Sequence, residues 1–347
     1  MANIMMTQRC NLKCEYCFAN EFVNKKSTDI TEENFRKAVD FIMTDPNERI
    51  GLIGGEPTVH PKLKHFLEIL MEDNRVHNVV LFTNGINLDK FIIPLMNNKF
   101  HILVNCNSAK DIGQTQYDKM VKNIDKCINK YYMRDKITLG INLYDIKMDY
   151  KYIIDLLKKY NMNTLRISIT VPNCNDKRTV DALEHFSKYK NFILKFFRDL
   201  DKIGVVPFYD CNPMPPCLLE EKERQEIVER LERNRVPNSN LLGDRCRCEP
   251  VIDILTNLEA VRCFGLSEYK KLNICNYRNI MELRCDFARI FDAYEFNTCS
   301  SEKCKTCHER LIMRCSGGCL AFKIADILKL HSLSEELTQP KEIENKE

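Results

Sequence analysis

The sequence predicts an α/β fold followed by a cysteine-rich cap, and three observations support this prediction. From Ala2 to about Phe208, short apolar strands alternate with amphipathic helices, which favours a parallel sheet covered by helices. The segment Asp210–Cys217 then carries three prolines and two cysteines and is typical of a linker. Beyond it, ten of the 18 cysteines lie between Cys246 and Cys319 inclusive, so metal rather than a large core is expected to hold that part together.

The first part contains the repeated strand–helix units. Strands are predicted at Asn3–Thr7, Arg49–Ile53, Asn78–Thr83, His101–Cys106, Lys136–Leu143, Thr164–Val171 and Val205–Tyr209. Helices are predicted at Thr31–Met43 (with Thr31 as its N-cap), Pro61–Glu72, Asp111–Tyr132, Lys151–Tyr160 and Thr179–Ile203. Roughly six units fit, which is fewer than the eight of a complete barrel. The repetition alone therefore allows either an open doubly wound sheet or a barrel.

The second part is predicted to be a smaller unit. It is expected to contain a charged helix at Leu219–Arg233, a hairpin formed by Val251–Leu255 and Glu259–Arg262, and a helix at Tyr277–Phe296. We therefore divide the chain into a first domain over residues 1–208, a cysteine-rich domain over 209–330 and a polar tail over 331–347.

Charge and hydropathy exclude several functional classes. The net charge is +3 and shows no basic stripe, so neither a nucleic-acid partner nor a membrane surface is expected. No apolar run approaches the roughly 18–20 residues that span a bilayer. The first eight residues lack the charged and apolar regions of a signal peptide. We expect a cytoplasmic protein in which the cysteines bind metal rather than form disulfides.

Three cysteines follow the first predicted strand at the spacing C-x3-C-x2-C: Cys10, Cys14 and Cys17. Thiolates favour zinc or an iron–sulfur cluster. A structural zinc site would need a fourth close ligand, for which His60 is the nearest candidate in the sequence. On a 4Fe–4S cluster, three thiolates leave one iron open, and an open iron can chelate the amino and carboxylate groups of S-adenosylmethionine. We favour the cluster over a structural zinc loop.

With Tyr16 as the aromatic residue, this segment resembles the C-x3-C-x-aromatic-C signature of the radical S-adenosylmethionine (SAM) superfamily. The resemblance implies a partial (β/α)6 barrel of TIM-barrel type, a 4Fe–4S cluster on the three cysteines and SAM as cofactor, with its adenine beside Tyr16. It also implies that Gly54, Gly55 and Glu56, followed by proline, receive the methionine amino group through backbone carbonyls and the glutamate.

Polar residues on the later strands complete the SAM site that the resemblance implies. Asn105, Asn107, Asn142 and Arg166 are the candidates for contacts with the ribose and the methionine carboxylate. Side chains at the carboxyl ends of such strands face the cofactor. Many relatives carry Ser and Asp in place of Asn105 and Asn107, which is a departure. The alternative is that these polar residues face water or cap helices.

The C-terminal cysteines form a second pattern. Cys248 and Cys263 bracket the predicted hairpin, and Cys304, Cys307, Cys315 and Cys319 follow at the spacing C-x2-C-x7-C-x3-C. This pattern resembles the SPASM extension of radical SAM enzymes, which binds auxiliary 4Fe–4S clusters. The sequence departs from the extension in three ways: Leu258 replaces the hairpin glycine, the third spacing is seven rather than five, and no cysteine follows Cys319.

The resemblance implies two groups of auxiliary ligands. The first would comprise Cys248, Cys263 and Cys319 with Cys246 or Cys217. The second would comprise Cys304, Cys307 and Cys315 with Cys299. Two full clusters need eight ligands, and these candidates supply them. One full cluster beside a cluster with an open iron, or a zinc knuckle over Cys304–Cys319, is the alternative.

The function implied is reductive cleavage of SAM, followed by hydrogen abstraction from a substrate and its net oxidation. Relatives with the extension mostly modify peptides, so we predict C–S or C–C crosslinking of a ribosomally synthesised precursor peptide. The alternatives are a small-molecule dehydrogenase, a protein-modifying enzyme resembling the sulfatase maturases, and a non-catalytic zinc-binding module. Flavodoxin or ferredoxin would supply electrons. Because nine residues precede Cys10, leader recognition would need a separate protein or another surface.

Overall fold

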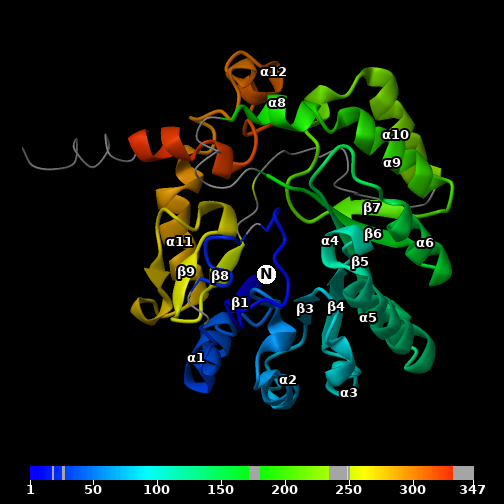
Figure 1. Ribbon diagram of the computed structural model, residues 1–347. Coiled ribbons are helices and arrows are strands. Elements are labelled where there is room, and N and C mark those ends of the chain that lie inside the picture. Colours follow the sequence, from blue (N-terminus) through cyan, green and yellow to red (C-terminus); the bar gives the residue numbers. More distant parts are fainter. Residues whose placement is uncertain (18, 26–27, 172–179, 234–247, 249–250, 331–347) are drawn as a thin grey trace, which may run out of the picture.

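The computed structural model describes residues 1–17, 19–25, 28–171, 180–233, 248 and 251–330 (Figure 1). Seven parallel strands stand in sequential order, which is the arrangement of a barrel rather than of a doubly wound sheet. They are β1 (Ala2–Met5), β2 (Ile50–Ile53), β3 (Val79–Thr83), β4 (Phe100–Asn105), β5 (Ile137–Leu143), β6 (Thr164–Ile169) and β7 (Val206–Tyr209). The predicted partial barrel is confirmed.

Helices cover the outer side of these strands (Figure 1). They are α1 (Glu32–Ile42), α2 (Leu63–Glu72), α3 (Ile92–Leu95), α5 (Gln114–Asp125), α6 (Lys151–Lys159) and α9 (Lys190–Asp201). Two short helices, α4 (Ala109–Ile112) and α8 (Ala182–Ser187), lie beyond the ends of the strands instead (Figure 1). Thr31 caps α1 as predicted, because its side chain accepts a hydrogen bond from the Asn34 amide at 3.1 Å. Phe35 and Phe66 stack between α1 and α2 with their ring centroids 4.4 Å apart.

Two predicted helices are interrupted. The helix expected at Asp111–Tyr132 is split at Gly113, whose φ of 82° lies in the left-handed region. The helix expected at Thr179–Ile203 is split into α8 and α9, and the Ala182 amide at the start of α8 donates to the Ser300 carbonyl at 2.9 Å. Contact with a distant segment therefore sets where α8 begins.

The C-terminal part extends the same sheet. It contains α10 (Glu221–Arg233), β8 (Ile252–Ile254), β9 (Glu259–Val261), β10 (Leu272–Asn273), α11 (Ile280–Ile290) and α12 (His308–Leu311). Strand β8 pairs in parallel with the free edge of β1, and β9 and β10 follow in antiparallel order. The predicted hairpin is present, and Leu258 in its turn has a φ of 67°. Leucine thus adopts at this position a conformation that glycine adopts without strain.

Asp253 is a carboxyl group buried in the sheet beside β1. The side-chain amide of Asn3 donates to Asp253 Oδ1 at 2.6 Å, and burial raises the pKa of Asp253 to about 7. The folded chain therefore holds this proton more tightly than the unfolded chain, whose aspartates titrate near 3.8.

We expect the free energy of unfolding to fall as the pH rises from about 4 to about 7, the interval between the two pKa values. Since each pKa unit corresponds to about 1.4 kcal/mol, the loss is of the order of 4 kcal/mol. Denaturant unfolding across this interval measures it. Asp253→Asn should flatten the profile, whereas Asp135→Asn, at a 95% exposed side chain, should leave it unchanged. An unchanged profile in Asp253→Asn would contradict the assignment.

Within the described residues, no helix is both long and apolar enough to cross a bilayer.

Candidate active site

A cavity of about 1580 Å³ opens where the carboxyl ends of the parallel strands meet the C-terminal part. Residues at or just beyond the ends of β2, β3, β4, β5, β6 and β7 line it, together with the first cysteine loop and the cap. Pockets for small ligands usually measure about 300–1,000 Å³. The cavity therefore has room for a ligand in addition to a nucleoside-sized cofactor.

The loop that carries the first three cysteines is anchored at its start, by contacts of Arg9, Cys10 and Asn11. The Arg9 guanidinium forms a bidentate pair with Asp29, with nitrogen–oxygen distances of 3.0 and 2.7 Å. The Cys10 amide donates to Asn24 Oδ1 at 2.9 Å, and Asn84 Nδ2 donates to Asn11 Oδ1 at 2.7 Å. These contacts hold the loop over the strand ends.

The three cysteines predicted to hold the first cluster, Cys10, Cys14 and Cys17, are half-buried and line the cavity together. Burial is the main cause that raises the pKa of Cys10 to about 12, and repulsion from Glu56 and then from the other two cysteines adds to it. Burial also raises the pKa values of Cys14 and Cys17. Three neighbouring thiols facing a large cavity fit a cluster that keeps one iron open, and cluster assembly would have to displace their protons.

The turn that begins at Gly54 packs directly on the cysteine loop. The Gly55 amide donates to the Thr7 carbonyl at 2.8 Å, and the Glu56 amide donates to the Arg9 carbonyl at 2.9 Å. A Cβ atom at Gly55 would lie 2.3 Å from the Arg9 carbonyl oxygen. Glycine is therefore required here by the approach of two backbone segments.

Glu56 is buried, and its carboxylate already accepts four hydrogen bonds. Oε1 accepts from the Thr58 amide at 3.1 Å and from the hydroxyls of Thr58 and Thr83, each at 2.6 Å. Oε2 accepts from the Asn84 amide at 2.7 Å. These bonds join the Gly54 turn to the end of β3. The glutamate thus fixes the turn. Its Oε2, which accepts one hydrogen bond, and the backbone carbonyls of the turn can still accept from a ligand in the cavity.

Gly55→Ala is expected to destabilise the protein by about 1–3 kcal/mol, because the new methyl group would force two backbone segments apart. Thermal or denaturant unfolding measures the loss. Gly140→Ala is the matched control, since a Cβ there would meet side-chain atoms of Arg166, Leu103 and Asn105 at 3.2–3.4 Å, and side chains can shift. Equal losses in the two variants would contradict this account of Gly55.

The four polar residues predicted on the later strands all line the cavity. Arg166 on β6 donates to Asn142 Oδ1 on β5 at 2.6 Å and, more weakly, to Asn105 Oδ1 on β4 at 3.4 Å. Its Nε donates to Asp210 Oδ2 at 2.6 Å, just beyond β7. The structure thus brings three of the predicted residues into one network and adds Asp210 to it.

Tyr16 and Asn107 form a separate aromatic corner. The Tyr16 hydroxyl donates to Asn107 Oδ1, and the Tyr16 ring stacks on Tyr144 with centroids 4.2 Å apart and an interplanar angle of 8°. The Tyr144 hydroxyl donates to Asp111. Asn107 therefore presents its amide nitrogen rather than its oxygen as a free polar group. Tyr144 was not predicted from the sequence, although it directly follows a predicted strand.

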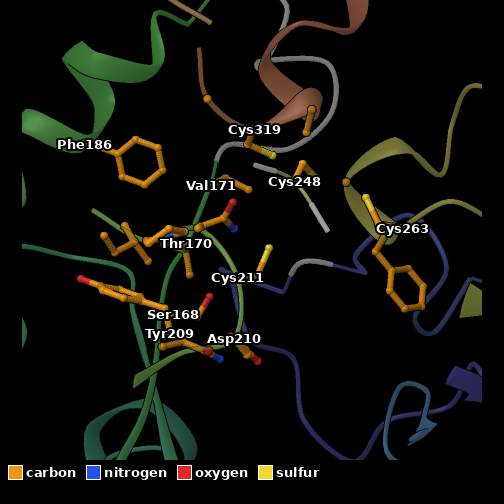
Figure 2. Close-up of a pocket in the computed structure, with 18 of the residues that line it drawn as sticks. Ser168, Thr170, Val171, Phe186, Tyr209, Asp210, Cys211, Cys248, Cys263 and Cys319 are labelled. Atoms are coloured by element: carbon orange, nitrogen blue, oxygen red, sulfur yellow. The ribbon is translucent and has the colours of Figure 1, made fainter. Parts of the chain in front are cut away.

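A first group of C-terminal thiols surrounds the upper part of the cavity (Figure 2). Cys248 shares a hydrogen bond with Cys319, and this contact, followed by burial, raises the pKa of Cys248 well above its usual value. Cys211 is accessible from the cavity. Desolvation by the surrounding protein raises the pKa of its thiol to about 12, and repulsion from Cys248 and Cys263 makes smaller contributions. Figure 2 shows these four side chains approaching one another above Tyr209 and Asp210.

A second group lies around α12. Burial raises the pKa of Cys304 to about 12, and repulsion from neighbouring thiols adds to it. The neighbours concerned are Cys217, Cys299, Cys315 and Cys307. Burial raises the pKa of Cys217, and its thiol neighbours are Cys315 and Cys307. The structure therefore places Cys217 with the second group, whereas the sequence associated it with the first. Cys246 lies outside the described residues.

Two buried cations accompany these thiols. Arg262 is only 1% exposed, donates to the Cys248 carbonyl at 2.9 Å and pairs with Asp292 at 2.8 Å. Lys323, also 1% exposed, donates to the carbonyls of Glu295 and Ser316 and lies near the thiols of both groups. Asp292 already compensates the charge of Arg262. Burial lowers the pKa of Lys323 and the neighbouring thiols raise it, so an anionic, thiolate-ligated cluster beside Lys323 would stabilise its charged form.

The donor sets thus fit three iron–sulfur clusters by their chemistry: three thiols at the barrel end, and four and five thiols in the two C-terminal groups. Among the residues that the structure describes, no three His, Cys, Asp or Glu side chains are close enough to hold a single metal ion.

The cysteines outside these three groups differ in exposure. Cys106 and Cys127 are buried, whereas Cys285 is exposed.

Comparison with known families decides the superfamily, because a family model described as "Radical SAM superfamily" matches residues 4–186. The chain belongs to the radical SAM superfamily. Its fold is similar to that of two solved structures. Streptococcus suis SuiB bound to SAM matches with a TM-score of 0.63 and 15% identity over 92% of this chain and 72% of SuiB. A structure named anSMEcpe, with bound SAM and a peptide, matches with a TM-score of 0.60 and 18% identity over 96% and 99% of the two chains.

The curated relatives similar in sequence carry other names. The mitochondrial GTP 3′,8-cyclase of Arabidopsis thaliana is 31% identical over 148 residues, 40% of this chain and 38% of the relative. A dihydro-hydroxymethylpterin dimethyltransferase of Methanocaldococcus jannaschii is 28% identical over 167 residues, 48% and 29% of the two chains. The chain covers only 23–29% of the first three such relatives.

Proposed function

We propose that this radical SAM enzyme oxidatively crosslinks a ribosomally synthesised peptide through a C–S or C–C bond, using auxiliary clusters held by the C-terminal cysteines. The observation that supports the proposal is that one large cavity joins the thiols at the barrel end to both C-terminal thiol groups. Both solved structures named above share this fold, and one was determined with a peptide. SuiB was also determined bound to its precursor peptide SuiA.

Cys10, Cys14 and Cys17 would hold the catalytic cluster, which, when reduced by a flavodoxin or ferredoxin, supplies a 5′-deoxyadenosyl radical from SAM. The carbonyls of the Gly54 turn would accept hydrogen bonds from the methionine amino group. Arg166 would attract the methionine carboxylate while Asn105, Asn142 and Asp210 hold its guanidinium in place. Tyr16 and Asn107 would border the adenine.

The auxiliary clusters would accept the electron that a substrate radical gives up. Cys211, Cys248, Cys263 and Cys319 would hold the first, and four of Cys217, Cys299, Cys304, Cys307 and Cys315 the second. Arg262 and Lys323 would balance the negative charge of the thiolates. Forming one crosslink from a C–H bond and an S–H or second C–H bond removes two hydrogens from the peptide.

The test is anaerobic incubation of the reconstituted enzyme with SAM, a reductant and a library of cysteine-containing peptides. We expect 5′-deoxyadenosine and peptides lighter by two hydrogens, detected by mass spectrometry. A small-molecule substrate is the second candidate, because the curated relatives include a GTP 3′,8-cyclase. If GTP alone is consumed and no peptide loses hydrogen, the peptide proposal fails and the small-molecule function stands.

A further inference from the structure

Helix α10 presents two different faces. One is anchored on α9, since Glu223 pairs with Lys190 and Glu226 pairs with Arg198, each at 2.8 Å. The opposite face lines the cavity and consists of Glu221, Arg224, Gln225, Val228, Glu229 and Glu232. These positions recur every three or four residues, so they share one side of the helix.

The cavity face of α10 has an excess of negative charge. Glu221, Glu229 and Glu232 are exposed and pair with no cation among the residues that the structure describes. Arg224 is the one cation on this face, and its Nε is directed to the Pro216 carbonyl at 3.1 Å. A ligand that enters along α10 therefore meets three carboxylates, and cationic groups on that ligand would be attracted to them.

Another wall of the same cavity ends in an apolar rim, which we define as Leu311, Ile312 and Met313. These side chains are 66%, 43% and 63% exposed, and the residues on both sides of them, Arg310 and Arg314, line the cavity. The rim lies in the Cys307–Cys315 loop, which is two residues longer than the usual SPASM spacing. Because Cys217 neighbours Cys307 and Cys315, the start of α10 lies close to this loop.

We propose that the cavity face of α10 and the apolar rim form the entrance groove for the substrate peptide, and that the peptide segment bound there carries cationic and apolar side chains. The inference rests on the proposed function, because it assumes a peptide substrate. Charge complementarity favours a cationic peptide segment, because an acidic segment would be repelled by the three glutamates on the cavity face of α10. Continuity of both walls with the cavity allows the same peptide to reach the thiols at the barrel end.

Two synthetic fluorescent peptides of equal length test the groove, one alternating lysine with leucine and the other alternating glutamate with leucine. Fluorescence anisotropy with the reconstituted enzyme should show at least about tenfold tighter binding of the lysine peptide, weakening with added salt. The double variant Glu229→Gln/Glu232→Gln should weaken binding of the lysine peptide about three- to tenfold and reduce its salt dependence. The matched control, Glu72→Gln/Glu268→Gln, removes two exposed carboxylates outside the cavity and should change neither.

The rim is tested separately. Leu311→Asn/Met313→Asn should weaken both peptides by a similar factor, and asparagine tolerates the φ of 58° at Met313. Ile93→Asn, at another exposed apolar residue, is its control. Unchanged iron content and circular dichroism would show that the variants fold.

Equal binding of the two peptides, or equal effects of the cavity and control variants, would overturn the groove. If peptides of either charge nevertheless lose two hydrogens at the same rate, the proposed function stands without the groove. If no peptide binds and GTP is consumed, both fail.

Discussion

Replacing Cys14 by alanine is expected to reduce 5′-deoxyadenosine formation to background. Three thiols face the cavity at the barrel end, and two would not hold a cluster that must also keep one iron open. The iron content should fall from about twelve to about eight per chain, since each 4Fe–4S cluster carries four irons. Iron and sulfide analysis after anaerobic reconstitution, with chromatography of the nucleoside product, measures both effects.

Cys285→Ala is the matched control for this experiment. Cys285 is exposed on α11 and does not line the cavity, so its removal should change neither iron nor product. Retention of product formation in Cys14→Ala would refute the assignment of the catalytic cluster to this loop. Loss in both variants would indicate a general failure of reconstitution, and the comparison would then be repeated with Cys14→Ser.

The barrel could be predicted from the sequence because its strands are buried on both faces and appear as short apolar runs. The predicted Thr164–Val171 and the observed Thr164–Ile169 differ only at the end. The pairing of β8 with β1 could not be predicted in this way, because it joins segments about 250 residues apart and local periodicity carries no information about partners. The break at Gly113 had a local signal, a glycine within a helical pattern, and was missed.

The residues of the candidate site also divide into those that could be predicted from the sequence and those that could not. The first three cysteines lie within eight residues, so their spacing alone predicts that they act together. Asp210 and Cys211 join the site only because β7 ends beside β6 and beneath the cap. Arg262 and Lys323 had no sequence signal beyond lying near cysteines. Four other basic residues lie equally near cysteines in the sequence but are not buried: Lys303, Lys305, Arg310 and Arg314. The two sets of basic residues differ in burial, and the burial of a single charged residue depends on the tertiary fold rather than on the local sequence.

The assignment of Cys211 and Cys217 to different auxiliary clusters leads to the second large expected effect. Each single variant, Cys211→Ala or Cys217→Ala, should lose up to about four irons per chain, and so should Cys248→Ala. The single variants do not reveal which cysteines share a cluster. Double variants do, because two ligands of one cluster give non-additive losses and ligands of separate clusters give additive ones.

Cys211→Ala/Cys248→Ala is therefore expected to lose no more iron than Cys248→Ala alone. Cys217→Ala/Cys248→Ala is expected to lose both auxiliary clusters and retain about four irons, with 5′-deoxyadenosine formation still present. Mössbauer or electron paramagnetic resonance spectra would show which signal disappears. The reverse pattern, with Cys217 non-additive and Cys211 additive to Cys248, would overturn the assignment.

Cys246→Ala separates this assignment from the one that the sequence alone suggested. The resemblance to the SPASM extension implied Cys246 or Cys217 as the fourth ligand of the first cluster, whereas the structure surrounds Cys211 with Cys248 and Cys263. If Cys211 completes the first cluster, Cys246→Ala keeps about twelve irons. The linker after β7 then ties the two clusters to the SAM site, because Asp210 pairs with Arg166 and the next residue holds an auxiliary cluster. A substrate radical formed beside Arg166 would thus lie next to its electron acceptor, which favours net oxidation over a redox-neutral rearrangement.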